Sequence, residues 1–424
     1  MKSILRERNL ELLILFFFVF GSIFPTLRIL TIGGQTSGNL REYIFSVIPE
    51  LISVLVLSFS GILFYKNKHV IKLLPFDWIL ICFALTNVLL GFYIAKDVLM
   101  SMYGFRMSYF PIIFYFIFRF GDKELLINII HKTIIWFFII GIIGLILYFG
   151  FYEQMIWMLK KTNPLVQEYF IVRMTSIFWS PVLFSTIMVT TFTYFYYKFL
   201  ESPLWYYYLI LGLSWSCILL SVTRGGFVVI SFGFIFITII QKKWKLSAQI
   251  FLLLIAIFII IGYYISTPLT FLYWILRSVS DTVGMKEGIT RVDLWLKAIE
   301  NFKTHPFGFG LGKAGHVAAR FYKDSKDNIA IYSTDGWYLK LANETGIWGL
   351  LSYFFLAIYF FAICIKSKFI KFTENRFVWL FALFMMVNIQ NIVSNVLDFY
   401  LFSFFYWGVI GLIINILYSK IKKA

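Results

Sequence analysis

Apolar runs of roughly 18–22 residues follow one another along this 424-residue chain, and each is long enough to cross about 30 Å of hydrocarbon. Hydrophobic residues make up 60% of the sequence and charged residues only 14%. A soluble domain could not bury this much apolar surface. A chain inside a bilayer must satisfy its backbone hydrogen bonds internally, and the alternation typical of a transmembrane barrel is missing. The sequence therefore predicts an all-α polytopic integral membrane protein.

The apolar runs predict about twelve membrane-spanning helices within a single membrane domain that covers residues 1–424. They lie near 9–27, 44–65, 74–95, 99–118, 132–151, 178–198, 204–222, 225–241, 247–266, 346–365, 377–396 and 399–418. With twelve spans, five clusters of lysine and arginine fall on one side of the membrane: those at 2–8, 66–72, 242–245, 366–371 and 420–423. Because positively charged loops stay in the cytoplasm, we expect both termini there.

Two long loops are expected on the outer side, at about 152–177 and 267–345, and the second precedes the tenth span. Eight arginines lie on or near this side: Arg28, Arg41, Arg106, Arg173, Arg224, Arg277, Arg291 and Arg320. Guanidinium groups make paired contacts with phosphate oxygens, so we expect an anionic ligand on this face. The net charge of +17 comes largely from loops that orient a membrane protein, so it does not indicate nucleic-acid binding.

Three of these arginines are candidates for binding that anionic ligand. Arg224 lies in SVTRGG, in a short outer turn whose two glycines allow a ligand to approach the backbone. Arg173 lies in VRMTSIFWSP just before the sixth span, and Arg106 lies inside the fourth apolar run. An arginine at that depth needs an anionic partner, which for Arg106 is a ligand or one of Glu50 and Asp97. The alternative for the other two is an interfacial anchor whose head group reaches water.

The segment that starts at Thr290 is predicted to be a helix, because Thr290 and Asp293 fit a capping box. Its apolar residues recur at helical spacing: Leu294, Trp295, Ala298, Ile299 and Phe302. Arg291 lies in the first turn, where free backbone amides and the helix dipole favour a phosphate. The alternative is an ion pair between Arg291 and Asp293 or Glu287.

The sequence HPFGFGLGKAGH follows this helix. It carries four glycines: Gly308, Gly310, Gly312 and Gly315. Their amides are candidates for cradling phosphate oxygens, and the alternative is a simple turn that returns the chain to the membrane. His316 is a candidate base or hydroxyl-orienting group. His305 precedes Pro306 and shapes the turn in the alternative interpretation.

Asp335 opens the sequence DGWYLKLANE, which leads into the tenth span. A carboxylate at this position is placed to activate an acceptor hydroxyl. Asp335 or Thr334 is equally a natural N-cap for the following helix. Trp337 and Tyr338 fit an interfacial aromatic belt first and a sugar-binding platform second.

Neither a metal nor a cofactor is indicated by the sequence. Cys82, Cys217 and Cys364 all fall inside apolar runs, and no spacing of His, Cys, Asp and Glu suggests a metal site. The glycine-rich sequence is no dinucleotide fingerprint, because it lacks a strand–turn–helix context. We expect a reaction that needs no cofactor.

Three sequence motifs, in this order, resemble the O-antigen ligase and polymerase superfamily. SVTRGG resembles that family's S-R-G/A signature at an outer turn. The pattern R-x3-W-x2-A…HP-x-G-x-G-x-G resembles the start of its large periplasmic loop, and DGWYLKLANETGIWGLL resembles the end of that loop. The layout of twelve spans with a large loop before the tenth also matches.

The resemblance implies a GT-C-like fold and a metal-independent, inverting glycosyl transfer from an undecaprenyl diphosphate-linked oligosaccharide, outside the bacterial cytoplasmic membrane. Arg224 and Arg291 match the family's basic positions, which bind the diphosphate, and Arg173 matches less closely. Ligases typically carry His where this chain has Asp335, and Asn where it has Gly336. The resemblance therefore favours a polymerase.

We expect a repeat-unit polymerase for an O-antigen, capsule or exopolysaccharide, with the lipid bilayer and a chain-length regulator as further partners. One alternative is a ligase that moves finished glycan to lipid A core or a wall acceptor. Another is a flippase or exporter of lipid-linked sugars, which is expected to carry charge along a central cavity. Here charge is concentrated in outer turns and one outer loop, which favours an enzyme.

Overall fold

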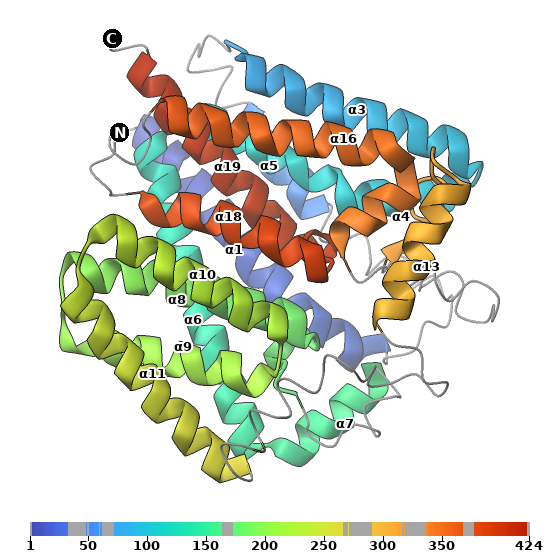
Figure 1. The fold of residues 1–424 in the computed structure, drawn as a ribbon. Helices are drawn as coiled ribbons and strands as arrows, with labels where there is room; N and C mark the ends of the chain where they lie inside the picture. The colour runs from blue at the N-terminus through green and yellow to red at the C-terminus, as the bar shows by residue number, and fades with distance from the viewer. Residues whose placement is uncertain are drawn as a thin grey trace. The chain divides into compact units, whose positions relative to one another are not determined.

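The computed structural model describes residues 2–32, most of 48–61, 72–162, 173–265, 291–315, 336–367 and 377–421, with the single residues 270 and 318. Every regular element within these ranges is a helix (Figure 1). Seven of them are long and apolar enough to cross a membrane, as expected of a polytopic membrane protein. These spans are Asn9–Leu27, Pro75–Ala95, Lys123–Gly150, Arg224–Gln241, Trp244–Ile265, Trp337–Lys366 and Tyr400–Ser419.

Other expected spans differ from these seven. The runs at 204–222 and 377–396 form helices that are apolar but shorter, Trp205–Ser221 and Val378–Val393. Half of the run at 44–65 lies outside the described residues. The total of twelve spans stays a prediction.

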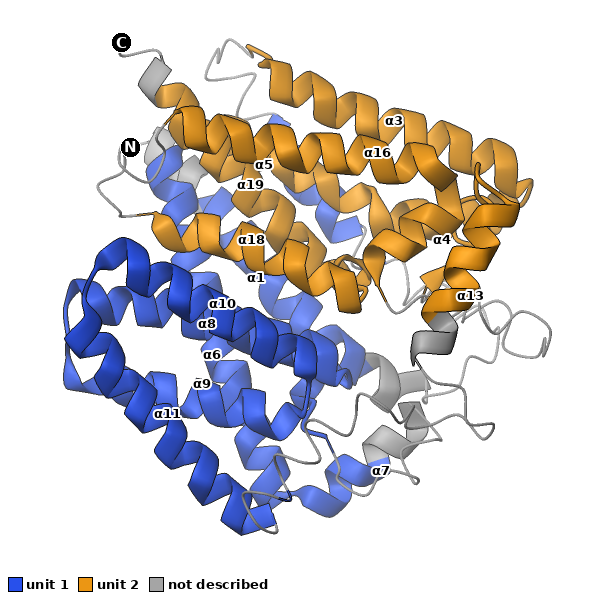
Figure 2. Cartoon of the chain, in the orientation of Figure 1, with its two compact units in different colours: residues 1–69, 121–286 blue, residues 70–120, 287–424 orange. Residues whose placement is uncertain are grey.

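The chain divides into two compact units, each built from two separate stretches of sequence (Figure 2). The first unit, 1–69 and 121–286, holds α1 (Lys2–Ile32), α6 (Lys123–Gly150), α7 (Tyr152–Thr162), η3 (Ser176–Phe178), α8 (Pro181–Glu201), α9 (Trp205–Ser221), α10 (Arg224–Gln241) and α11 (Trp244–Ile265). The second, 70–120 and 287–424, holds α3 (Pro75–Ala95), α4 (Val98–Ser108), η1 (Phe110–Ile112), α5 (Ile113–Phe120), α13 (Arg291–Thr304), α16 (Trp337–Lys366), α18 (Val378–Val393), η5 (Val396–Asp398) and α19 (Tyr400–Ile421). The single membrane domain stays a prediction.

In the first unit, the buried helix α8 packs against α6, α9 and α10. It begins after Ser180, whose hydroxyl accepts a hydrogen bond from the Leu183 amide, and Pro181 takes its first position. Proline is tolerated there because that amide needs no partner inside the helix. The hydroxyls of Thr190 and Thr191 donate to carbonyls one turn earlier, so these buried side chains stay hydrogen-bonded.

In the second unit, α19 is buried along nearly its whole length and packs closely along α5. Gly411 allows this approach, because a Cβ atom there would lie 2.3 Å from the carbonyl oxygen of Tyr115. The side-chain amide of Asn415 donates to the carbonyl of Phe118 at 3.0 Å. Small residues and interhelical hydrogen bonds are the usual means by which helices associate in a membrane.

The fourth apolar run, expected as one span over 99–118, is instead divided into α4, η1 and α5. Pro111 lies in η1, at the break. Its ring carries no amide hydrogen and clashes with the preceding turn of a continuous helix. Because of this break, Arg106 lies in the last turn of α4 and not inside a continuous membrane span.

Candidate functional site

The turn between α9 and α10 brings two of the candidate arginines together. Helix α9 ends at Ser221, and Val222 takes a left-handed conformation, with φ 47°, that leads into α10 at Arg224. The Nε atom of Arg173 donates a hydrogen bond to the Ser221 carbonyl at 3.1 Å. Both arginines are half-buried. Arg173 therefore lies against the turn that carries Arg224.

The same turn presents the amino-terminal end of α10. Thr223 is the N-cap, but its hydroxyl shares a hydrogen bond with the Ser221 hydroxyl and caps no amide. Gly226 lies against α8, because a Cβ atom there would lie 2.2 Å from the Oγ atom of Ser185. That buried hydroxyl has no hydrogen-bond partner among the described residues. Amides at a helix start, the helix dipole and two guanidinium groups all favour a bound anion.

A second arrangement is built around a bend in α16. The bend lies at Gly346, whose φ of 67° and ψ of −152° are outside the helical region. A Cβ atom at Gly346 would lie 2.1 Å from the Pro306 carbonyl oxygen, so only glycine fits. That carbonyl accepts a hydrogen bond from the Ile347 amide at 2.8 Å. The Pro306 carbonyl, which lies before α16 in the sequence, thus takes the place of a helix carbonyl as the acceptor for the Ile347 amide.

The bend also frees carbonyls that a straight helix would use internally. The Asn343 carbonyl accepts from the Phe309 amide at 2.8 Å, and the Glu344 carbonyl accepts from the Gly310 amide at 2.9 Å. A straight helix would pair these carbonyls with amides one turn later. The HPFGFGLG and ANETG sequences therefore form one interlocked structure.

This interlock decides what the glycine amides do. The Gly308 amide donates to the His305 carbonyl at 2.8 Å, and Gly310 donates to Glu344 as described. The Gly312 amide donates to Oε1 of Glu344 at 2.9 Å. Three of the four glycine amides that were expected to cradle phosphate are therefore occupied by protein oxygens in this structure. The finding favours the alternative, a turn held against the membrane helices.

Beneath the glycine segment lies a buried charged cluster on α16. Lys340 is fully buried, and its Nζ atom lies 2.5 Å from Oδ1 of Asp398 and 2.6 Å from Oγ of Ser108. Glu344, one turn along the same helix, places Oε2 at 3.9 Å from that Nζ atom. A Cβ atom at Gly315 would lie 2.7 Å from Oδ2 of Asp398, so the glycine segment covers the cluster.

The sequence motifs did not single out this cluster. The available signal was Lys340 followed four residues later by Glu344 at the entry of an apolar span, since such charges are costly in a membrane and need partners. The partners Ser108 and Asp398 lie 232 and 58 positions away from Lys340 along the chain. No local pattern would have paired them.

Arg106 lies in the last turn of α4, between two tyrosine rings. Its guanidinium carbon is 5.8 Å from the ring centroid of Tyr103 and 5.8 Å from that of Tyr400. All three side chains are partly exposed. Asp97, one of the expected protein partners, is the N-cap of α4 and accepts from the Met100 amide at 3.1 Å. Cation–π contacts with two rings hold the guanidinium in place without neutralising it.

Several expected site residues lie outside what the structure describes. These are His316, Asp335, Glu50 and the side chain of Arg291, which begins helix α13 as expected. His305 is exposed, and its Nδ1 atom is hydrogen-bonded to the Thr304 hydroxyl at 3.0 Å. Its ring lies over Phe309, with 4.3 Å between centroids, as expected of a residue that shapes the turn.

The two aromatic residues at the start of α16 face inward. Trp337 is only 1% exposed, and its ring meets Tyr353 edge-on at 4.5 Å. The hydroxyl of Tyr338 donates to the backbone and side-chain oxygens of Asn388 at 2.9 and 3.1 Å. Burial of Trp337 in the helix packing leaves it no exposed face, so it is neither a surface belt residue nor an open sugar platform here.

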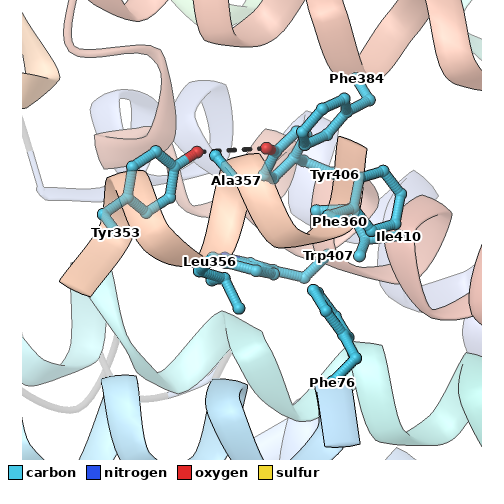
Figure 3. Close-up of a pocket in the computed structure, with 9 residues that line it drawn as sticks. All are labelled: Phe76, Tyr353, Leu356, Ala357, Phe360, Phe384, Tyr406, Trp407 and Ile410. Atoms are coloured by element: carbon cyan, nitrogen blue, oxygen red, sulfur yellow. Dashed lines mark hydrogen bonds between the residues drawn. The ribbon is translucent and has the colours of Figure 1, made fainter. Parts of the chain in front are cut away.

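A pocket in the second unit is lined by aromatic and aliphatic side chains (Figure 3). Among them are Phe76, Phe384 and Trp407. The hydroxyls of Tyr353 and Tyr406, which also line it, are hydrogen-bonded to each other at 3.2 Å. None of its nine lining residues is charged, so it does not suit a diphosphate.

Residues 209–354 match the family of O-antigen ligases. The match supports a place in the O-antigen ligase and polymerase superfamily, a part in polysaccharide assembly, and glycosyl transfer as the reaction, without separating ligase from polymerase. No curated protein matches the chain significantly.

The O-antigen ligase match covers less than half of the chain, but it contains both arrangements in part. It includes the α9–α10 turn with Arg224, the helix that begins at Arg291, and the bend at Gly346. Arg173 and Arg106 lie outside it. Within the first unit, Arg173 is hydrogen-bonded to the matched turn at Ser221. Within the second unit, Ser108, two residues after Arg106, is hydrogen-bonded to the matched Lys340.

Proposed function

We propose that this chain is a repeat-unit polymerase, which joins undecaprenyl diphosphate-linked oligosaccharides into an O-antigen, capsule or exopolysaccharide. The transfer is inverting and metal-independent, and it takes place on the outer face of the bacterial cytoplasmic membrane, with both termini in the cytoplasm. One observation carries the proposal: Arg173 is hydrogen-bonded to the turn from which Arg224 starts α10.

The chemistry follows from this placement. A sugar carried on a diphosphate already has a good leaving group, so the main requirement is to stabilise the negative charge that grows as the glycosidic bond breaks. Arg173, Arg224 and the first amides of α10 supply fixed positive charge and donors for that purpose. Because these groups are set by the fold, little reorganisation is needed when the charge develops.

The acceptor side rests on Asp335, with His316 as the other candidate. A carboxylate at position 335 takes the proton from the attacking sugar hydroxyl, which then displaces the diphosphate from the opposite face. Gly336 fixes the start of α16, because its amide donates to Oδ1 of Asn395 at 3.1 Å. Arg291, the first residue of α13, is a further candidate for binding the diphosphate.

A ligase is the second candidate, since the matching family is described by that activity. It would transfer finished glycan to lipid A core or a wall acceptor through the same diphosphate site. We place the polymerase first because this chain has Asp335 where ligases of the resembled family typically carry His. As a polymerase, the chain would act together with a chain-length regulator as its protein partner.

Reconstitution tests the proposal. The purified full-length protein is placed in vesicles with a labelled undecaprenyl diphosphate oligosaccharide, and the products are analysed for chain length and carrier. A ladder of longer glycans that remain on the lipid is expected. Transfer only after addition of a lipid A core or wall acceptor would establish the ligase. Movement of intact substrate across the bilayer, with no new glycosidic bond, would overturn the enzyme.

A further inference from the structure

Lys340 places a charge in the interior of the second unit. Its ammonium group lies near three side chains: Asp398 in η5 at 2.5 Å, Ser108 at the end of α4 at 2.6 Å, and Glu344 on α16 at 3.9 Å. A buried ion pair gives little net stability compared with apolar side chains of the same volume. Its contribution is to fix which groups lie next to one another.

The two elements joined by Lys340 are those that frame Arg106. Ser108 follows Arg106 by two residues on α4, and Asp398 precedes Tyr400 by two residues. The Arg106 guanidinium lies over the ring of Tyr400 at 5.8 Å. A shift of α4 relative to η5 would therefore separate the guanidinium from that ring. Lys340 bonds both elements at once and opposes such a shift.

The residues around Lys340 fall into a buried group and a partly exposed group. Lys340 and Asp398 are buried, whereas Arg106, Tyr103 and Tyr400 are all partly accessible. Lys340 is enclosed by Asp398, Ser108 and Glu344, so a ligand cannot reach it. Arg106 is partly accessible, and the two aromatic rings orient its guanidinium.

We propose that Lys340 is a positioning residue that, through Ser108 and Asp398, sets Arg106 and the two tyrosines as one binding face for a phosphate group of the lipid-linked glycan. The guanidinium takes the phosphate oxygens, and the tyrosine rings lie beside the adjoining sugar. This inference rests on the proposed function and assigns Lys340 no contact with substrate.

The mildest test is Ser108→Ala, which removes one hydrogen bond of Lys340 and leaves the ion pair with Asp398 intact. Lys340→Met with Asp398→Asn is the second variant, since it removes the closest ion pair and does not leave Asp398 as a buried carboxylate without its cation. Glu344 keeps its hydrogen bond from the Gly312 amide in this variant. Tyr353→Phe is the matched control, because it also removes a buried hydroxyl that contacts Asn388 and Tyr406, but none that contacts α4 or η5.

Two quantities are measured for each protein: affinity for undecaprenyl diphosphate in detergent, and KM and kcat for the lipid-linked oligosaccharide. Ser108→Ala is expected to raise KM and weaken the affinity several-fold, and the double variant about tenfold, with kcat within about threefold of the wild type. The control is expected to leave both quantities unchanged.

Unchanged KM and affinity in both variants, in a wild-type protein that binds and transfers, would overturn the positioning role alone. An equal loss in Tyr353→Phe would also overturn it, because the effect would then be a general loosening of α16. A wild-type protein that neither binds the diphosphate lipid nor transfers sugar would overturn the proposed function together with this inference.

Discussion

Arg173 and Ser221 are joined by a hydrogen bond of 3.1 Å from the Nε atom to the backbone carbonyl, across 48 positions of sequence. The residue three positions after Ser221 is Arg224, the first of α10. The turn therefore carries one arginine and binds the other.

Replacement of either arginine by alanine is expected to lower transfer by about a hundredfold or more, because each removes a fixed charge from the leaving diphosphate. Arg224→Lys and Arg173→Lys should also lose activity, since an ammonium group cannot make the paired contact. Lys242→Ala, at the opposite end of α10, is the control and should transfer normally. Wild-type product from an alanine variant with normal membrane insertion would remove that arginine from the mechanism.

Gly310→Ala is expected to destabilise the second unit. Gly310 has a φ of 105°, and a Cβ atom there would lie 2.3 Å from backbone atoms of Ala95. The strained backbone and the overlap together cost about 2–5 kcal/mol. Thermal unfolding in detergent checks this. Gly150→Ala is the matched control, because a Cβ atom there meets nothing within 4 Å, and an unfolding temperature equal in the two variants would contradict the prediction.

Glu344 offers a graded test of the interlock between the glycine segment and α16. Glu344→Gln keeps an oxygen for the Gly312 amide, whereas Glu344→Ala leaves that amide buried without its acceptor. The alanine variant should be less stable than the glutamine variant by about 1–3 kcal/mol. Amide hydrogen exchange at Gly312 should be faster in Glu344→Ala alone. Equal exchange in the two variants would mean that this bond does not hold the segment.

Asp77 is expected to be essential for folding, independently of transfer. It is fully buried, accepts from the Leu74 amide at 2.7 Å and the Tyr115 hydroxyl, and lies 3.4 Å from Nε of Arg119. Asp77→Ala leaves Arg119 as a buried charge without this carboxylate, at a cost of about 3–5 kcal/mol. Folded yield after detergent extraction is the measurement.

The control for Asp77 is a carboxylate at the protein surface. Glu124 is 81% exposed and pairs with Lys123 at 3.5 Å, so Glu124→Ala should change stability by about 0.5 kcal/mol or less. A folded yield for Asp77→Ala equal to that of Glu124→Ala would show that the buried carboxylate is dispensable.

Sequence patterns predicted most helices that are formed by continuous apolar runs, such as α3, α10 and α11. They failed where one residue interrupts a run. Pro111 divides the fourth span, and Gly346 bends α16. Hydropathy counts apolar residues over a window, so it registers neither a missing amide nor a single left-handed residue.

The candidate site was predictable only where its residues are neighbours in sequence. Arg224 and its turn were found from SVTRGG, and the turn itself is confirmed. The glycine-rich motif was found, but the role of its amides was not, because their acceptors belong to α16 and α3. Lys340 was missed because its partners come from two other helical segments.

The division of the second unit into two stretches of sequence has a consequence for biogenesis. Asn415 bonds Phe118 across 297 positions, and Lys340 bonds Ser108 across 232. Helices α3 to α5 are therefore synthesised long before α16 and α19. Until then, α3 to α5 lie in the bilayer without these packing partners. Because α5 gains its close neighbour only when α19 is inserted, this half of the protein can be completed only after α19 has been made.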